Sequence, residues 1–79
     1  MQATTYKLGK KGAAHTPRTG NQNNVASWAG LQAALKAGKG SATGAQIIAA
    51  IKQHNPENMG NAIGYTKYAV RNQWLVPAK

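Results

Sequence analysis

Large apolar side chains are scarce in this chain, and their scarcity limits the core that it can build. Hydrophobic residues make up 42% of the 79 residues, but fifteen of them are alanine and phenylalanine is absent. A domain this small buries only ~60% of the surface that its unfolded chain exposes, so it is marginally stable. Cysteine is absent as well, so neither a disulfide nor a thiolate metal site can reinforce it. The sequence therefore predicts one small domain.

Charge restricts the function, because ten Lys and Arg residues stand against a single acid, Glu57. The formal net charge is +9 at pH 7. Paired-carboxylate catalysis, a Mg²⁺ site and a Ser–His–Asp triad all need acids that the chain lacks. The two histidines, His15 and His54, are too few for a metal site. We therefore expect a non-enzymatic binding protein with no cofactor and no metal, whose partner is polyanionic.

Neither a membrane span nor a secretion signal is expected. No run in the sequence approaches the ~20 apolar residues that are needed to cross a membrane. Residues 1–12 are polar and basic, unlike the apolar segment of a signal peptide. Together with the absence of cysteine, these features favour a cytoplasmic location.

The composition changes near Asn24. Residues 1–23 are rich in Gly, Asn, Lys and Arg and hold few apolar anchors. This predicts a basic, mostly flexible N-terminal arm, with residues 9–23 as its mobile part. Residues 4–8 are the exception, because they alternate in polarity, favour β-structure and can add one short strand. Residues 24–79 are predicted to form the helical domain.

Three helices are predicted in this domain, near residues 25–37, 43–54 and 59–73. Asn24 is the candidate N-cap of the first. Thr43 and Gln46 fit a capping box at the start of the second, with Ser41 as a competing cap. Asn55 precedes a proline, so it ends the second helix, and either Asn55 or Asn58 can cap the third.

Apolar side chains recur at helical spacing in all three helices, so each has one side that faces a shared core. The predicted core consists of Trp28, Leu31, Leu35, Ile47, Ile48, Ile51, Ile63, Val70 and Trp74. On a helical wheel, the core side of the third helix holds Met59, Ile63, Thr66 and Val70, with Ala62 and Ala69 at its edge.

The opposite side of the third helix carries no acid, which is unusual for a solvated surface. It holds Asn61, Tyr65, Tyr68 and Asn72, flanked by Gly64, Lys67 and Arg71. Asn can read adenine, Arg can read guanine or bind phosphate, and Tyr can bind phosphate or stack on a base. One interpretation is a nucleic-acid interface. The other is that the tyrosines cover neighbouring apolar surface and the asparagines are simply solvated.

Residues 24–76 resemble a helix-turn-helix unit of the winged-helix kind, as in small bacterial and phage-encoded DNA-binding proteins. The matching pieces are residues 43–48 as the start of the second helix, 58–72 as the recognition helix and 68–76 as the passage into the first wing strand. The fold class that this resemblance implies is mainly α, a three-helix winged-helix-like domain.

Two features depart from the winged-helix pattern. The chain ends at Lys79, so we expect no second wing strand after residues 74–76. Residues 4–8 can supply the partner strand instead, which gives a two-stranded β element beside the helices. The turn at residues 55–58 is also longer than the tight turn of the simplest helix-turn-helix.

The resemblance implies that the helix at 59–73 enters the major groove and that the helix at 43–54 crosses the DNA backbone. The side chains that face the bases would then be Asn61, Tyr65, Tyr68 and Asn72. Phosphate contacts would come from Lys52, Lys67 and Arg71, and from a basic arm that carries Lys7, Lys10, Lys11 and Arg18.

The function implied is that of a small basic DNA-binding protein, a regulator or a nucleoid-type factor. It would act on duplex DNA in the bacterial nucleoid or in a phage-infected cell. Two alternatives stay open: a phage-type protein that inhibits or redirects an acidic host protein, and an RNA- or ribosome-associated protein. Composition does not separate DNA from RNA, and Tyr and Arg also dominate the hot spots of protein–protein interfaces.

Overall fold

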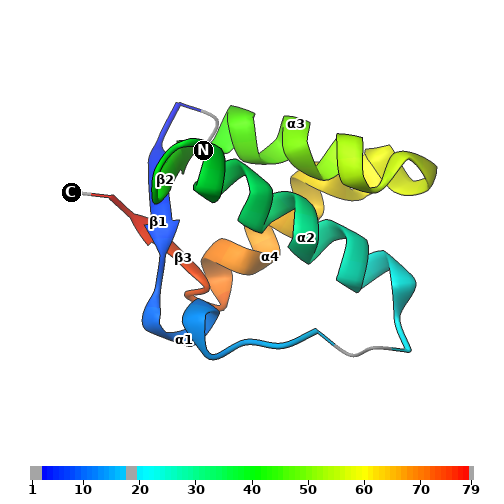
Figure 1. Ribbon diagram of the computed structural model, residues 1–79, viewed down its shortest axis with the longest axis horizontal. Helices are drawn as coiled ribbons and strands as arrows, with labels where there is room; N and C mark the ends of the chain where they lie inside the picture. Colours follow the sequence, from blue (N-terminus) through cyan, green and yellow to red (C-terminus); the bar gives the residue numbers. More distant parts are fainter. Residues whose placement is uncertain (1–2, 18–19, 79) are drawn as a thin grey trace.

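The structure is a computed structural model that describes residues 3–17 and 20–78. Helix α2 (Gln22–Ala37) packs against α3 (Gly44–His54) and also contacts α4 (Ala62–Arg71), with a small sheet beside them (Figure 1). The remaining elements are β1 (Thr5–Leu8), α1 (Lys10–Ala13), β2 (Ser41–Thr43), the 3₁₀ helix η1 (Pro56–Asn61) and β3 (Leu75–Pro77). The expected mainly helical fold is confirmed. Among the described residues, no helix is long and apolar enough to cross a membrane.

The N-terminal strand β1 is the middle strand of the sheet, between β2 and β3, and it runs antiparallel to both. Tyr6 pairs with Ala42 of β2 on one side and with Pro77 of β3 on the other. The predicted pairing of residues 4–8 with the strand after the third helix is therefore confirmed. Strand β2 was not predicted, because it is too short to show an alternating pattern and its last residue, Thr43, also caps a helix.

Helix α3 begins with the predicted capping box. The Thr43 side-chain oxygen accepts a hydrogen bond from the Gln46 N–H at 3.2 Å, and Gln46 Oε1 accepts from the Thr43 N–H at 2.9 Å. The predicted cap of α2 is wrong, since Asn21 and not Asn24 caps that helix. Asn21 Oδ1 accepts from the Asn24 N–H at 3.2 Å. Several capping side chains follow one another here, so composition alone does not select among them.

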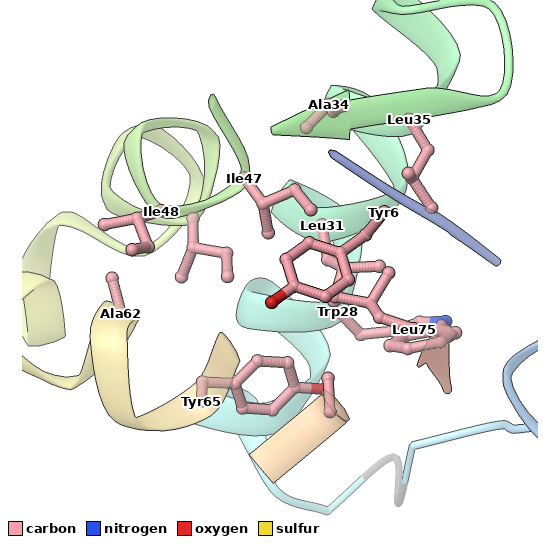
Figure 2. Close-up of a cluster of buried hydrophobic side chains, with 13 residues drawn as sticks. Tyr6, Trp28, Leu31, Ala34, Leu35, Ile47, Ile48, Ala62, Tyr65 and Leu75 are labelled. Atoms are coloured by element: carbon pink, nitrogen blue, oxygen red, sulfur yellow. The ribbon is translucent and has the colours of Figure 1, made fainter. Parts of the chain in front are cut away.

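The core lies where the helices meet the sheet. Its largest members are Tyr6, Trp28, Leu31, Leu35, Ile47, Ile48, Ile51, Tyr65 and Leu75 (Figure 2). The predicted core residues of α2 and α3 are all buried, and Val70 and Trp74 pack against them half-buried. Ile63 is the exception, because it is 40% exposed.

The buried face of α4 is rotated relative to the predicted one: Thr66 is buried as expected and so are Ala62 and Ala69 at its predicted edge, but Tyr65 is buried as well. Its buried residues are Ala62, Tyr65, Thr66 and Ala69. Met59 and Ile63 are 48% and 40% exposed, so their assignment to the core is wrong. Small side chains at Ala62 and Ala69 let α4 lie close to its neighbours, and the Tyr65 ring fills the remaining space. The 3₁₀ helix before α4, with about three residues per turn, also breaks the helical phase from which the face was predicted.

Part of the N-terminal segment folds against the end of α4. The Gly9 N–H donates to the Trp74 carbonyl oxygen at 2.8 Å. Gly12 is buried so close to Trp74 that a Cβ at this position would overlap the same carbonyl oxygen. His15 stacks on the Trp74 ring with 3.8 Å between ring centroids. Helix α1 and these contacts were not predicted, because they need glycines and one imidazole rather than apolar anchors. The mobility of residues 9–23 stays a prediction.

A buried polar cluster attaches the turn after α3 to helix α2. Asn55 is 6% exposed, and its Nδ2 donates to Asn23 Oδ1 at 2.7 Å and to Ser27 Oγ at 3.1 Å. The Asn55 side chain does not cap the following helix, so that expectation is wrong. A buried amide needs partners for its donors, and α2 provides them. Because this turn leads into η1 and α4, the cluster helps to set the position of α4.

Candidate nucleic-acid interface

The solvent side of α4 carries two cations in one line. Ile63, Lys67 and Arg71 are spaced four residues apart and exposed, so they follow one another along the helix by one turn. Gly64 and Tyr68 form the neighbouring line, and Tyr68 is 51% exposed. Neither line contains an acid. We call these five residues the α4 face.

Tyr65 is not part of the α4 face, so its predicted place on the base side is wrong. Its ring is 5% exposed and lies among the core side chains (Figure 2). Its hydroxyl is buried and has no hydrogen-bond partner within the described part of the chain. Burial, and secondarily the neighbouring Tyr68, raises the pKa of Tyr65 to about 12. Tyr65 is therefore a core residue that carries one unpaired polar group.

The two predicted asparagines lie at the ends of the α4 face. Asn61 is exposed immediately before α4, makes no capping hydrogen bond, and has its side-chain oxygen next to Gly64. Asn72 is half-buried after the helix, and its Nδ2 donates to the Tyr68 carbonyl oxygen at 2.8 Å. One donor of Asn72 is therefore already used to satisfy the end of α4, whereas Asn61 presents its amide to solvent.

Helix α1 brings two of the predicted cations to one end of the α4 face. Lys10 and Lys11 are exposed on α1, and α1 packs on the backbone of residues 73–74, just beyond Arg71 (Figure 1). Lys7 is exposed on the central strand, on the side opposite to the buried Tyr6. The remaining cation of the predicted arm, Arg18, lies outside the described residues.

A shallow hollow of about 230 Å³ lies between α3 and α4, beside the α4 face. It is lined by Ala45, Ile48, Ala49, Lys52 and Ile63. Lys52, a predicted phosphate ligand, is half-buried there and thus lies next to an isoleucine that was expected in the core. The exposure of Ile63 was missed because the apolar periodicity of the sequence places Ile63 on the core side of the helix.

An aromatic cluster closes the end of α4 that faces α1. Tyr68 meets the Trp74 ring nearly at a right angle, at 86°, with 5.3 Å between centroids. Trp28 contacts both Trp74 and His15 edge-on. Because the imidazole of His15 lies flat against Trp74, it covers one face of that indole. The cluster is therefore a packing contact between α1, α2 and α4 and not an open platform for stacking bases.

Metal-ligating side chains do not gather anywhere in residues 3–17 and 20–78: no three His, Cys, Asp or Glu residues lie close enough to hold an ion. No protein-family model matches the chain, and no curated protein or solved structure is significantly similar to it. Its function must therefore be inferred from the geometry and charge of its surface.

Proposed function

We propose that this chain is a small, non-enzymatic DNA-binding protein of the helix-turn-helix kind, which inserts the α4 face into the major groove of duplex DNA. The observation that carries the proposal is the exposed line of Ile63, Lys67 and Arg71, free of acids, on a chain with a formal net charge of +9. The major groove of B-DNA is about 12 Å wide and admits an α-helix. The proposed role is that of a regulator or nucleoid-type factor in the cytoplasm of a bacterial or phage-infected cell.

Each polar residue of the α4 face suits a group that DNA presents. Arg71 and Lys67 can bind guanine edges or phosphates, and the Tyr68 hydroxyl can donate to a phosphate. Asn61, at the start of the helix, can read an adenine edge. Lys10 and Lys11 continue the positive surface past the end of α4. In the proposed complex they would lie next to the DNA backbone at the edge of the groove.

The sheet supports the resemblance to winged-helix domains. Strand β3 follows α4 after residues 72–74, in the place where the first wing strand follows a recognition helix. Strand β1 pairs with it from the other end of the chain. In this proposal β1 takes the place of the second wing strand, and helix α1, which follows it, brings Lys10 and Lys11 to the DNA.

Duplex DNA fits this surface better than RNA does. The major groove of A-form RNA is deep and narrow, so side chains on a helix do not reach its base edges. Single strands are bound mainly by stacking on open aromatic rings. The indole of Trp74, which lies next to Tyr68 of the α4 face, is instead covered on one side by His15, with 3.8 Å between the ring centroids.

The second candidate function is binding to an acidic host protein. The exposure of Met59, Ile63 and Tyr68 favours it, because exposed apolar and aromatic groups also anchor protein partners. Such a partner would have to present acids to Lys67 and Arg71.

The test is a fluorescence anisotropy titration with four polyanions at low and at physiological salt. They are duplex DNA, the same sequence as single-stranded DNA, the same sequence as duplex RNA, and polyglutamate. We expect duplex DNA to bind most tightly at both salt concentrations and polyglutamate to lose its binding at physiological salt. Equal affinity for all four polymers, lost together as salt rises, would show that the charge is not organised for DNA. Preferential binding to polyglutamate would favour the acidic protein partner.

A further inference from the structure

Ile63 is exposed, although this domain has few large apolar side chains and buries most of them in its core. The other three isoleucines, Ile47, Ile48 and Ile51, are buried, with at most 6% of their surface exposed. Ile63 is 40% exposed and Met59, close to it in the sequence, is 48% exposed. Covering such a side chain with a partner would be favourable, so its outward position makes Ile63 a candidate contact residue.

The surroundings of Ile63 restrict the chemistry of that partner. The hollow beside it has walls of Ala45 and Ala49, which are small and apolar, and one cation, Lys52. Lys67 lies one helical turn further along α4. No acid lines this hollow or lies on α3 or α4. The occupant that fits this hollow therefore combines a small apolar group with negative charge close to it.

We propose that Ile63 contacts the C5-methyl group of a thymine and is a specificity-determining residue, with Lys52 on the phosphate backbone beside it. This inference rests on the proposed binding of α4 in the major groove. The thymine methyl is the apolar group that base pairs present in that groove, and each thymine is joined to phosphates. A thymidine nucleotide thus matches both the apolar wall and the cation of the hollow.

The experiment compares thymine with uracil in otherwise identical DNA. A duplex that wild-type protein prefers is selected from a randomised duplex pool and is then resynthesised with uracil in place of thymine. The affinity of each duplex is measured for wild type, Ile63→Ala, Ile63→Val and Leu8→Ala. Leu8 is the matched control, because it is also an exposed aliphatic residue, at 36%, but lies on β1. Melting temperatures confirm that all the variants are folded.

We expect wild type to bind the uracil duplex about fourfold more weakly for each methyl group that is contacted. Ile63→Ala should bind the two duplexes equally, Ile63→Val should keep part of the preference, and Leu8→Ala should keep all of it. Lys52→Gln should weaken both duplexes alike and flatten the salt dependence by about one contact. Any general effect of uracil on the duplex is shared by all the variants and cancels in the comparison.

Two negative outcomes are distinguishable. If wild type binds duplex DNA but does not distinguish thymine from uracil, or if Ile63→Ala keeps the preference, the inference about Ile63 is overturned while the proposed function stands. If no duplex from the pool is bound above the level of polyglutamate, the proposed function fails and the inference fails with it.

Discussion

Helices α3 and α4 both pack in the same small core, but they differ in which kinds of side chain they bury. Helix α3 buries three isoleucines, while α4 buries two alanines, a threonine and a tyrosine and leaves its isoleucine outside. In α3 the cap, the apolar stripe and the buried face agree, so the sequence predicts the helix well. In α4 the one isoleucine lies on the solvent side, next to cations, while small residues and a tyrosine are buried.

This difference indicates where the molecule has a function beyond folding. Local and global preferences usually agree in natural proteins, and places where they conflict are commonly functional. Part of the conflict, the exposed Ile63, lies one helical turn from Lys67. Helix α3 thus contributes mainly to the core, with Lys52 as its one proposed DNA contact, and α4 supplies most of the surface that we propose binds DNA.

The largest expected effect compares one isoleucine from each helix. Ile51→Ala should cost about 2–5 kcal/mol of unfolding free energy, enough to unfold a domain of this size, because Ile51 is fully buried. Ile63→Ala should change the unfolding free energy by no more than about 0.5 kcal/mol, as is usual for exposed residues. Urea denaturation of the two variants measures both values. Similar losses would mean that Ile63 is a core residue and that the comparison of the two helices is wrong.

The unpaired hydroxyl of Tyr65 predicts a loss of stability at alkaline pH. The unfolded chain ionises near pH 10, whereas burial raises the pKa of Tyr65 in the folded protein to about 12. The stability from this group is complete below pH 10 and is lost as the pH rises towards 12, by roughly 2–3 kcal/mol. Tyr65→Phe should lack this loss and be at least as stable as wild type at neutral pH, because no hydrogen bond is removed.

Stability curves of wild type and Tyr65→Phe from neutral pH to pH 12 test this prediction, since the other tyrosines and lysines titrate in both proteins. Parallel curves would show that the Tyr65 hydroxyl is not buried. A marked loss of stability in Tyr65→Phe at neutral pH would show that the hydroxyl has a partner in solution.

A smaller effect is expected where α1 meets the end of α4. Gly12→Ala should destabilise the fold by about 1–3 kcal/mol, because the added methyl would overlap the Trp74 carbonyl oxygen. Displacement of α1 should also move Lys10 and Lys11, so duplex binding should become less dependent on salt. Gly60→Ala is the control, since a Cβ at Gly60 would meet no atom within 4 Å. Equal behaviour of the two variants would show that α1 is not docked on α4 in solution.

The parts of the fold that the sequence predicts are those in which side chains provide the contacts. The Thr43 capping box, the isoleucine stripe of α3 and the pairing of residues 4–8 with the last strand belong to this group. The α1 contacts were missed because Gly9 and Gly12 act through the absence of a side chain. The burial of Tyr65 was missed because the approach of α4 depends on small residues, which a ranking by hydrophobicity places last.

The candidate site was predictable to a similar extent. Lys67, Tyr68 and Arg71 lie on the solvent side of the helix as predicted, because cations and a half-exposed tyrosine follow helical periodicity. Their role in binding stays a prediction. The hollow beside Ile63 could not be predicted, since it depends on how α3 and α4 pack and not on the pattern of either helix.

The most direct test of the proposed interface is the salt dependence of duplex DNA binding in two double variants. Lys67→Ala/Arg71→Ala removes the cations of the α4 face, and Lys36→Ala/Lys39→Ala removes two exposed cations at the far end of α2. If wild type makes about six phosphate contacts, its log–log slope is about −5. The α4 variant should flatten that slope by nearly two units, while the α2 variant should leave it close to the wild-type value. Equal flattening in both variants would mean that DNA responds only to net charge, which would contradict an interface on α4.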